Sequence, residues 1–193
     1  MYAFQVIVRT DRPVRRCRLT VESPVYDDLY QMGTIAAVKQ ILRLPDQNVR
    51  VMVEGKSRGR LAALTSTEPY LTAQVEPIDE PEPMLTTSSR TEAMIRQIYA
   101  GLERYTELSD RVPGEVYLKL LDSDDPGYIA DYAAQNLPLR YEDKQAILEE
   151  LRPTRRLARL CRILAREIQV LEAESELESK IHEEMAADQR DYV

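Results

Sequence analysis

Hydrophobic positions in the first 75 residues recur at the short spacings that are typical of β-strands. A polar turn separates the apolar run 34–44 from a second run, in which valines alternate with other side chains. A period of two predicts a half-buried strand, and a Pro/Asp/Asn cluster between two such runs predicts a hairpin. The turn is Pro45-Asp46-Gln47-Asn48, and the alternating residues are Val49, Val51 and Val53 against Arg50, Met52 and Glu54.

Other short apolar runs flank this hairpin on both sides. They comprise residues 6–8, 19–21, 60–64 and 70–75. Together they predict a small, mostly antiparallel sheet that curls around one core. Residues 77–88 follow with three prolines and no periodicity. Because proline neither joins a sheet interior nor continues a helix, we interpret this segment as a linker.

After residue 88 the hydrophobic period becomes helical. Ser88 or Ser89 can cap a first helix, which Pro113-Gly114 ends, and three shorter helices are expected at 115–121, 126–136 and 141–151. In the second of these, the Asp125 side chain can accept a first-turn N–H, while Pro126 has none to donate. The apolar face of the first helix carries Met94, Ile98, Leu102 and Tyr105.

The last helix is predicted over residues 154–189, on the order of 50 Å long. An unbroken apolar stripe covers only its first half, and the apolar residues beyond Leu171 continue on a rotated face. We therefore expect the first half to pack in a bundle and the second half to project or to contact something outside this chain. The stripe is Leu157, Leu160, Leu164, Ile168 and Leu171, followed by Leu177, Ile181 and Met185.

These elements predict an α+β fold with two lobes. We expect a β-rich lobe at residues 1–76, a linker at 77–88, and a helical lobe at 89–193 that ends in the long helix. The 193 residues are enough to bury a substantial core, and 44% hydrophobic with 31% charged residues is ordinary for a soluble globular protein.

Charge changes the picture because it is unevenly distributed. The net charge is −7, yet residues 1–20 carry +4 and residues 172–193 carry −6. The acidic balance argues against a general nucleic-acid binder. No apolar run reaches the roughly 18 residues of a membrane span, and the N-terminus shows no secretory signal. Cys17 and Cys161 are far apart and form no disulfide framework, so we expect a cytoplasmic setting.

Candidate chemistry is sparse, and each motif has a simpler explanation. Gly55-Lys56-Ser57 resembles the end of a phosphate-binding loop, but Arg50 stands where that motif needs glycine, so we interpret it as a strand-end turn and expect no ATP site. His182, on the acidic helix, has no Cys/His cluster around it, so neither a metal site nor a catalytic triad is indicated. Asp122, Asp124 and Asp125 lack the remaining ligands of a calcium loop, and capping explains Asp125.

Two surface features remain as candidates for interaction. Arginines at 9–18 lack interleaved aromatic residues, so they indicate a charged edge strand rather than a nucleic-acid patch, with pairing to the acidic tail as a further option. Met52 shares the polar face of its strand and is expected to be exposed or part-buried, where its thioether can adapt to apolar partners. The alternative is that another segment covers it. Leu42 and Tyr30 are added as further candidates for protein binding.

The order of motifs resembles the N-terminal substrate-recognition domain of bacterial Lon protease, over roughly residues 20–193. No single motif is decisive, but their uninterrupted order is a strong signal. The family usually opens with a Pro-Leu-Arg segment and a Phe-Pro-Gly strand, so we expect the first strands here to be missing or divergent. The motifs are Asp27–Thr34, Gln40–Asp46, Val51–Gly55, Asp125-Pro126-Gly127, Ala130-Asp131, Leu137-Pro138-Leu139, Asp143–Glu149, Glu167–Leu171, Met185 and Gln189–Tyr192.

The resemblance implies a PUA-like β-rich lobe, a helical lobe, and a long helix that leads to an ATPase ring. It also implies a function, the capture of unfolded, damaged or degron-bearing proteins and the organisation of a dimer or hexamer. The parent protein would use ATP and Mg and a Ser–Lys protease site, none of which this segment contains by motif. A free-standing Lon-like adaptor is the alternative hypothesis, and an enzyme in its own right has almost no support.

Overall fold

The computed structural model describes residues 2–5, 25–44, 49–68, 71–79, 88–109 and 111–191. The chain divides into two compact units, residues 1–81 and 82–193, which we describe separately. The predicted strands at 6–8 and 19–21, the arginines at 9–18 and the turn at 45–48 lie outside the described residues.

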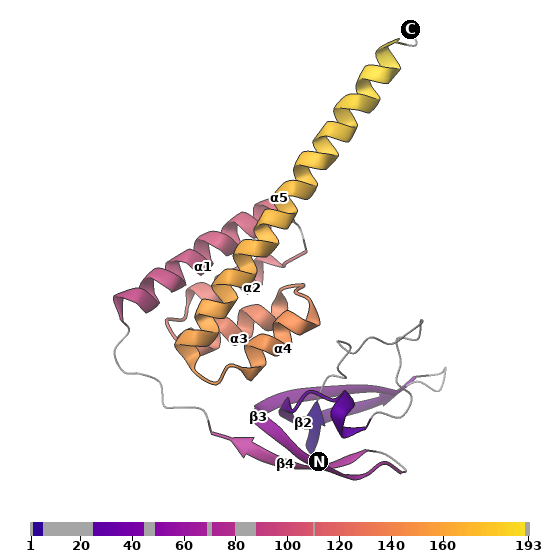
Figure 1. Ribbon diagram of the computed structural model, residues 1–193, viewed down its shortest axis with the longest axis vertical. Helices are drawn as coiled ribbons and strands as arrows, with labels where there is room; N and C mark the ends of the chain where they lie inside the picture. Colours follow the sequence, from indigo (N-terminus) through magenta and orange to yellow (C-terminus); the bar gives the residue numbers. More distant parts are fainter. Residues whose placement is uncertain are drawn as a thin grey trace. The chain divides into compact units, whose positions relative to one another are not determined.

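The first unit is built on an antiparallel sheet. Its described strands are β1 (Tyr2–Gln5), β2 (Met32–Arg43), β3 (Val49–Ser66) and β4 (Thr72–Ile78), in the order β1-β2-β3-β4, and a short 3-10 helix, η1 (Tyr26–Asp28), precedes β2 (Figure 1). β2 pairs with β3 from Met32 opposite Arg60 to Arg43 opposite Val49. The predicted hairpin and the antiparallel sheet are therefore confirmed.

One strand replaces what the sequence indicated as two strands and a turn. Gly55-Lys56-Ser57 lies within β3, so its interpretation as a strand-end turn is wrong. Instead of turning, the chain skips one residue in the ladder, since Ala36 pairs with Gly55 and Ile35 pairs with Ser57. Such a bulge bends a strand without ending it.

A second glycine of β3 is required by close packing across the sheet. A Cβ atom on Gly59 would lie 2.7 Å from Cγ1 of Val75 and 3.0 Å from Cγ1 of Ile35. Both approaches are shorter than van der Waals contact, so only hydrogen fits at this position. The buried hydrophobic residues of this unit lie near it in the sheet, at Leu29, Met32, Ala36 and Leu61.

The linker begins two residues later than the sequence indicated, because β4 continues through Pro77 to Ile78. Pro77 pairs with Gly59 in the ladder. Among the described strands β4 is at the edge of the sheet, where proline is tolerated since its missing N–H need not serve an inner ladder.

The second unit is helical throughout its described elements. α1 (Ser89–Leu108) is capped by Ser88, whose Oγ accepts the N–H of Thr91 at 3.2 Å, and α3 (Pro126–Asn136) is capped by Asp125, whose carboxylate accepts the N–H of Gly127 at 2.8 Å. Both predicted caps are confirmed, and local side-chain acceptors explain where these helices begin. The others are α2 (Gly114–Leu121), α4 (Tyr141–Glu149) and α5 (Pro153–Asp191).

One hydrophobic core joins the five helices. It takes the predicted faces of α1 and α5, with Ile98, Leu102 and Tyr105 packed together with Leu157, Leu160 and Leu164. Predicted residues Met94, Ile168 and Leu171 are partly buried against the same core. The buried core therefore extends along α5 only as far as the predicted end of the stripe.

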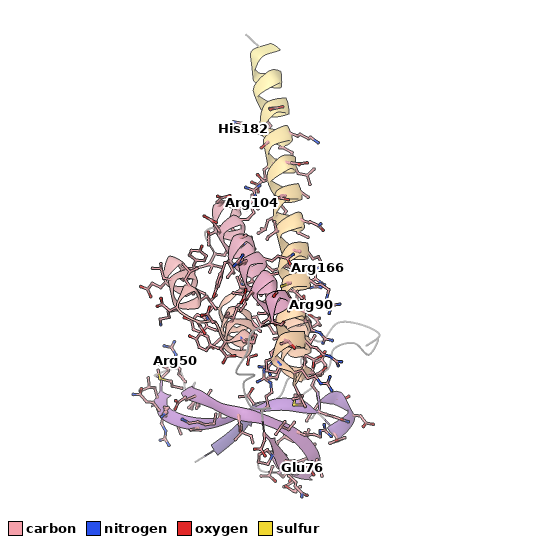
Figure 2. The ribbon with its side chains drawn as sticks, turned by 90° about the vertical axis from the view of Figure 1, so that its left-hand side faces the viewer. Arg50, Glu76, Arg90, Arg104, Arg166 and His182 are labelled. Atoms are coloured by element: carbon pink, nitrogen blue, oxygen red, sulfur yellow. The ribbon has the colours of Figure 1, made fainter. Side chains whose placement is uncertain are left out.

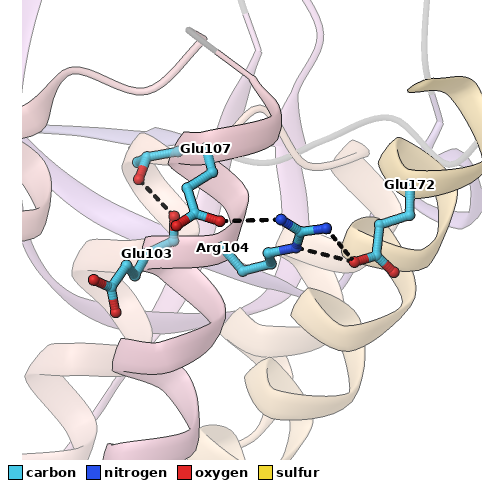
Figure 3. Close-up of polar contacts among 5 residues, drawn as sticks. Glu103, Arg104, Glu107 and Glu172 are labelled. Atoms are coloured by element: carbon cyan, nitrogen blue, oxygen red, sulfur yellow. Dashed lines mark hydrogen bonds and ion pairs between the residues drawn. The ribbon is translucent and has the colours of Figure 1, made fainter. Parts of the chain in front are cut away.

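An ion pair joins α1 to α5 at Glu172. Arg104 of α1 donates from Nε and Nη2 to one carboxylate oxygen of Glu172, at 3.0 Å each, and from Nη1 to Glu107 at 3.0 Å (Figure 3). Beyond Glu172, the described side chains of α5 are all exposed, including Leu177, Ile181 and Met185. Figure 1 shows this second half of α5 extending away from α1 to α4.

Candidate protein-binding surface

Part of the β2–β3 hairpin extends beyond the rest of the described sheet. β1 pairs with β2 only at residues 34–37, and β4 pairs with β3 only from Arg58 onward. Among the described strands, residues 38–43 therefore pair only with β3, and residues 49–57 pair only with β2. We call these two segments the hairpin arm.

One face of the hairpin arm carries two of the three residues that the sequence singled out. Met52 pairs with Gln40, and Leu42 pairs with Arg50 one step along the same face. Met52 is 58% exposed and Leu42 is 43% exposed. The structure thus brings these two side chains to one surface, and Met52 is exposed as expected from its polar neighbours.

The opposite face is more apolar, and the sequence analysis assigned it wrongly to the interior. Val49, Val51 and Val53 are exposed, with Val51 at 47%, although their alternation predicted a half-buried strand. Their partners across the ladder are Arg43, Ile41 and Val38. We call the five aliphatic residues of this face, which are Val38, Ile41, Val49, Val51 and Val53, the aliphatic strip.

A sequence signal for the aliphatic strip exists. Alternation buries one face only if another layer covers it, and the neighbours Ile41 and Leu42 point to opposite faces of one strand. An apolar residue on each face of a charged hairpin indicates apolar surface on both sides of it. Alternation taken alone gives the period of the strand and says nothing about what covers it.

Tyr30, the third candidate, lies elsewhere. It stands just before β2, in a half-buried position beside the buried Leu29. Leu42 is near the other end of β2, ten residues after Met32, or about 33 Å along an extended strand. Tyr30 therefore does not share a surface with Leu42 and Met52.

Near Tyr30's end of the sheet lies a shallow groove of about 350 Å³. The phenol of Tyr26 on its wall already donates to the carbonyl of Leu61 at 3.1 Å, which anchors η1 to β3. The groove is otherwise mostly apolar, with Val25, Ala62, Ala63, Leu64 and Thr67 as its other lining residues.

The hairpin arm is cationic although the chain as a whole is acidic. It carries Lys39, Arg43, Arg50 and Lys56 against the single carboxylate of Glu54, a formal charge of +3. Arg50 lies at one end of the sheet (Figure 2). Apolar side chains and positive charge therefore occur together on this surface.

Glu54 is held by two of these cations. Its carboxylate lies 2.6 Å from Nζ of Lys39 and 2.8 Å from Nζ of Lys56. Hydrogen bonds from these two ammonium groups lower the pKa of Glu54 to about 2. The carboxylate is thus ionised and engaged at neutral pH. Within the part of the chain that the structure describes, Arg43 and Arg50 form no such ion pair.

The remaining candidates give no reactive site in the part of the chain that the structure describes. His182 lies exposed on the second half of α5 (Figure 2), and no group of three or more metal-ligating side chains occurs among the described residues. No described helix is both long and apolar enough to span a bilayer. The hairpin arm offers noncovalent binding through apolar contact, positive charge and backbone.

Comparison with known structures defines the class of the fold. It is similar to the N-terminal domain of the Lon protease of the Mycobacterium avium complex, with a TM-score of 0.58 and 22% identity over 74% of each chain. The architecture is thus that of a Lon N-terminal domain, which confirms the α+β expectation.

The family follows from the sequence comparison. Residues 5–166 match the model of the substrate-binding domain of ATP-dependent protease La (LON), and the chain belongs to this family. The resemblance drawn from the motifs is confirmed, and the match begins at residue 5 rather than 20. The family is described as the substrate-binding domain of that protease.

Curated relatives carry the domain within much longer chains. The chain is 34% identical to the Lon protease of Desulforamulus reducens over 171 residues, which is 89% of this chain and 21% of that relative. It is 33% identical to Lon protease of Escherichia coli (strain K12) over 174 residues, which is 90% of this chain and 22% of that relative. With Lon protease 2 of Herpetosiphon aurantiacus it shares 34% identity over 195 residues, 100% of this chain and 24% of the relative. The chain spans between a fifth and a quarter of these relatives.

Proposed function

We propose that this domain captures unfolded, damaged or degron-bearing proteins through the hairpin arm and presents them to an ATP-dependent serine protease. The observation that carries the proposal is the exposure of apolar side chains on both faces of the arm, around Met52 and Val51. Unfolded chains expose apolar segments, and contiguous exposed apolar surface is typical of protein-binding sites. The parent would supply the ATP and Mg site, the Ser–Lys protease site and a cytoplasmic setting.

The test is binding of a permanently unfolded, dye-labelled protein to the full 193-residue chain, followed by fluorescence anisotropy. Met52→Glu places a charge on the exposed face of the arm, and we expect it to weaken binding at least tenfold. Gln74→Glu is the matched control, because it adds the same charge to an exposed position of β4 outside the arm. Unchanged binding by a folded Met52→Glu variant would remove Met52 from the site.

We also propose that the domain helps to organise an oligomer through the second half of α5. The residues Leu177, Ile181 and Met185 recur at spacings of four and are all exposed. This is the spacing at which a helix presents a seam to a partner helix. Weak binding arms repeated around an oligomer would then capture one substrate with higher avidity.

Sedimentation velocity at several protein concentrations tests the second proposal. We expect the wild-type chain to associate and the double variant Leu177→Ser, Ile181→Ser to sediment as a monomer. Ser179→Ala is the control, since it changes an exposed residue between them. A wild-type chain that stays monomeric at 100-fold higher concentration would instead favour the free-standing adaptor hypothesis for this segment.

A further inference from the structure

Among the described strands, the hairpin arm has an unpaired backbone edge as well as apolar faces. Along residues 49–57 of β3, one edge pairs with β2, and β4 occupies the other edge only from Arg58 onward. No described strand covers that second edge of residues 49–57. In a strand paired on one side, every second residue directs its N–H and C=O groups outward, where another strand can bind them.

This edge carries the charges of Arg50, Glu54 and Lys56, but it has no proline, and no bulge interrupts β3 before Lys56. Proteins block exposed edges with charges, proline, bulges or short strands. Here the bulge on β3 comes at Lys56, near the end of the segment, and each β3 residue from Val49 to Gly55 pairs in turn with a residue of β2. At about 3.3 Å per residue, the open edge is about 30 Å long.

The side chains along residues 49–57 indicate which residues a bound strand would carry. One face of the edge is aliphatic, with Val49, Val51 and Val53, and the other carries Arg50 next to Met52. Glu54, the carboxylate of this face, is already engaged by Lys39 and Lys56. Side chains directly across from each other on neighbouring strands interact, and opposite charges are favoured there. A complementary strand therefore alternates aliphatic with acidic residues.

We propose that the hairpin arm binds its protein substrate by strand addition, pairing residues 49–57 of β3 with an extended segment in which aliphatic residues alternate with Asp or Glu. This inference rests on the proposed function, since it states how that same arm recognises its substrate. Backbone hydrogen bonds would supply affinity for any extended chain. Val49, Val51 and Val53 would select the aliphatic side chains of the bound strand, and Arg50 would select an acidic one.

The backbone part of the proposal is tested with dye-labelled decapeptides and the full 193-residue chain. A peptide that alternates Val and Glu is compared with two forms, one N-methylated at every Val and one at every Glu. A bound strand directs only one of these two sets of N–H groups toward the domain. We expect one form to lose at least tenfold in affinity and the other to bind nearly as the parent peptide does. Equal affinities of the two forms would overturn strand addition, as would no binding of the parent peptide.

The side-chain part is tested with a charge exchange and needs no unfolded substrate. We expect a peptide that alternates Val and Lys to bind at least tenfold more weakly than the Val–Glu peptide, and Arg50→Glu to reduce or reverse that preference. Val51→Thr, which keeps the shape and β-branching, should weaken both peptides. Leu118→Thr is the matched control, because Leu118 is an exposed apolar residue of α2. A preference for Lys, or none, in the wild-type chain would overturn the acidic assignment.

The same samples separate this inference from the proposed function. If unfolded protein binds and Met52→Glu weakens it, but the two N-methylated forms bind equally, then capture stands and strand addition is wrong. If neither unfolded protein nor any peptide binds, both fail. A third outcome is that the wild-type chain forms a dimer, Val51→Thr converts it to a monomer, and the two N-methylated peptides bind equally. In that case the edge pairs with a second copy of the chain, and the proposal is overturned.

Discussion

Arg156 of α5 is fully buried, and its guanidinium donates to the carboxylate of Asp131 on α3. The same guanidinium donates from Nε to the carbonyl of Glu150 at 2.9 Å and from Nη2 to the carbonyl of Leu151 at 3.3 Å. One side chain thus ties the start of α5 to α3 and to the segment that follows α4. Buried charges require such partners, because an uncompensated one is costly.

Loss of the Asp131 charge should destabilise the helical unit. Asp131→Asn leaves the buried guanidinium of Arg156 without its carboxylate, and we expect the free energy of unfolding to fall by about 3 kcal/mol. Urea denaturation followed by circular dichroism at 222 nm measures this change. Asp122→Asn, at an exposed position after α2, should change the free energy by less than about 0.5 kcal/mol. Equal effects of the two variants would show that the buried pair is not a main tie of this unit.

The hairpin arm should respond to acid at an unusually low pH. The pKa of Glu54 is about 2, below its ordinary value of 4.5, because Lys39 and Lys56 donate hydrogen bonds to the ionised carboxylate. A depressed pKa means that the stabilisation is complete above about pH 4.5 and is lost as the pH falls toward 2.

A carboxyl-carbon NMR titration of Glu54 checks this behaviour. We expect a midpoint near 2 in the wild-type chain and one closer to 4.5 in Lys39→Met. Because all three side chains are exposed, 0.5 M salt should also move the midpoint upward. A wild-type midpoint near 4.5 at low salt would mean that the two lysines do not hold the carboxylate in solution.

The packing of α1 against α5 should depend on the absence of a side chain at Gly101. A Cβ at this position would lie 2.8 Å from Cδ2 and 3.3 Å from Cγ of Leu164, which is itself buried. Gly101→Val therefore overpacks the core, and we expect it to cost about 1–3 kcal/mol of unfolding free energy. Thermal unfolding measures the change. Gly114→Val serves as control, since nothing lies within 4 Å of a Cβ there, and a comparable loss in both variants would contradict the packing argument.

The second half of α5 should become more stable as salt is added. Residues 172–193 carry a net −6 near the C-terminal end of the helix, where the helix dipole is also negative. Glu174 and Glu178 add like-charge repulsion at a spacing of four. Salt screens these repulsions, so amide hydrogen exchange at residues 177–185 should slow between 20 mM and 500 mM NaCl.

That exchange experiment carries its own control in α1. Amides of Ile98 and Leu102 lie in the buried core and should change little with salt. The measurement is made at a concentration where sedimentation shows a monomer, so that association does not protect the helix. Faster exchange at high salt would mean that favourable ion pairs, such as one between Glu176 and Lys180, outweigh the repulsions.

The sequence predicted the elements whose signals are local. Caps such as Ser88 and Asp125, the prolines that end helices, and the 3/4 spacing on α1 and α5 depend on neighbours within a few residues, so they can be read without a fold. The bulge at Lys56 cannot be read in this way. It is a property of the register between β2 and β3, in which Ala36 pairs with Gly55 and Ile35 pairs with Ser57.

Burial depends on distant contacts, and it is where prediction failed. Met52 and Leu42 lie on one exposed face of the arm, whereas the alternation of Val49, Val51 and Val53 wrongly predicted a half-buried strand. Their exposure depends on whether another layer packs over that face, which no pattern within β3 encodes. Tyr30, the third candidate, precedes β2, whereas Leu42 lies near the far end of that strand, and residue type alone does not encode this separation.

The continuity of α5 also has a mechanical consequence. The same helix is clamped in the core at Leu164 and tied at Glu172, and then runs on for 19 residues to Asp191. At 1.5 Å per residue this free part is a lever of about 28 Å, so that a tilt of about 10° at Glu172 displaces the far end by about 5 Å. A force applied at that end therefore acts on the α1–α5 contact through a long lever arm. In the other direction, a small change in the angle of α5 at the core displaces its far end by about the rise of one helical turn.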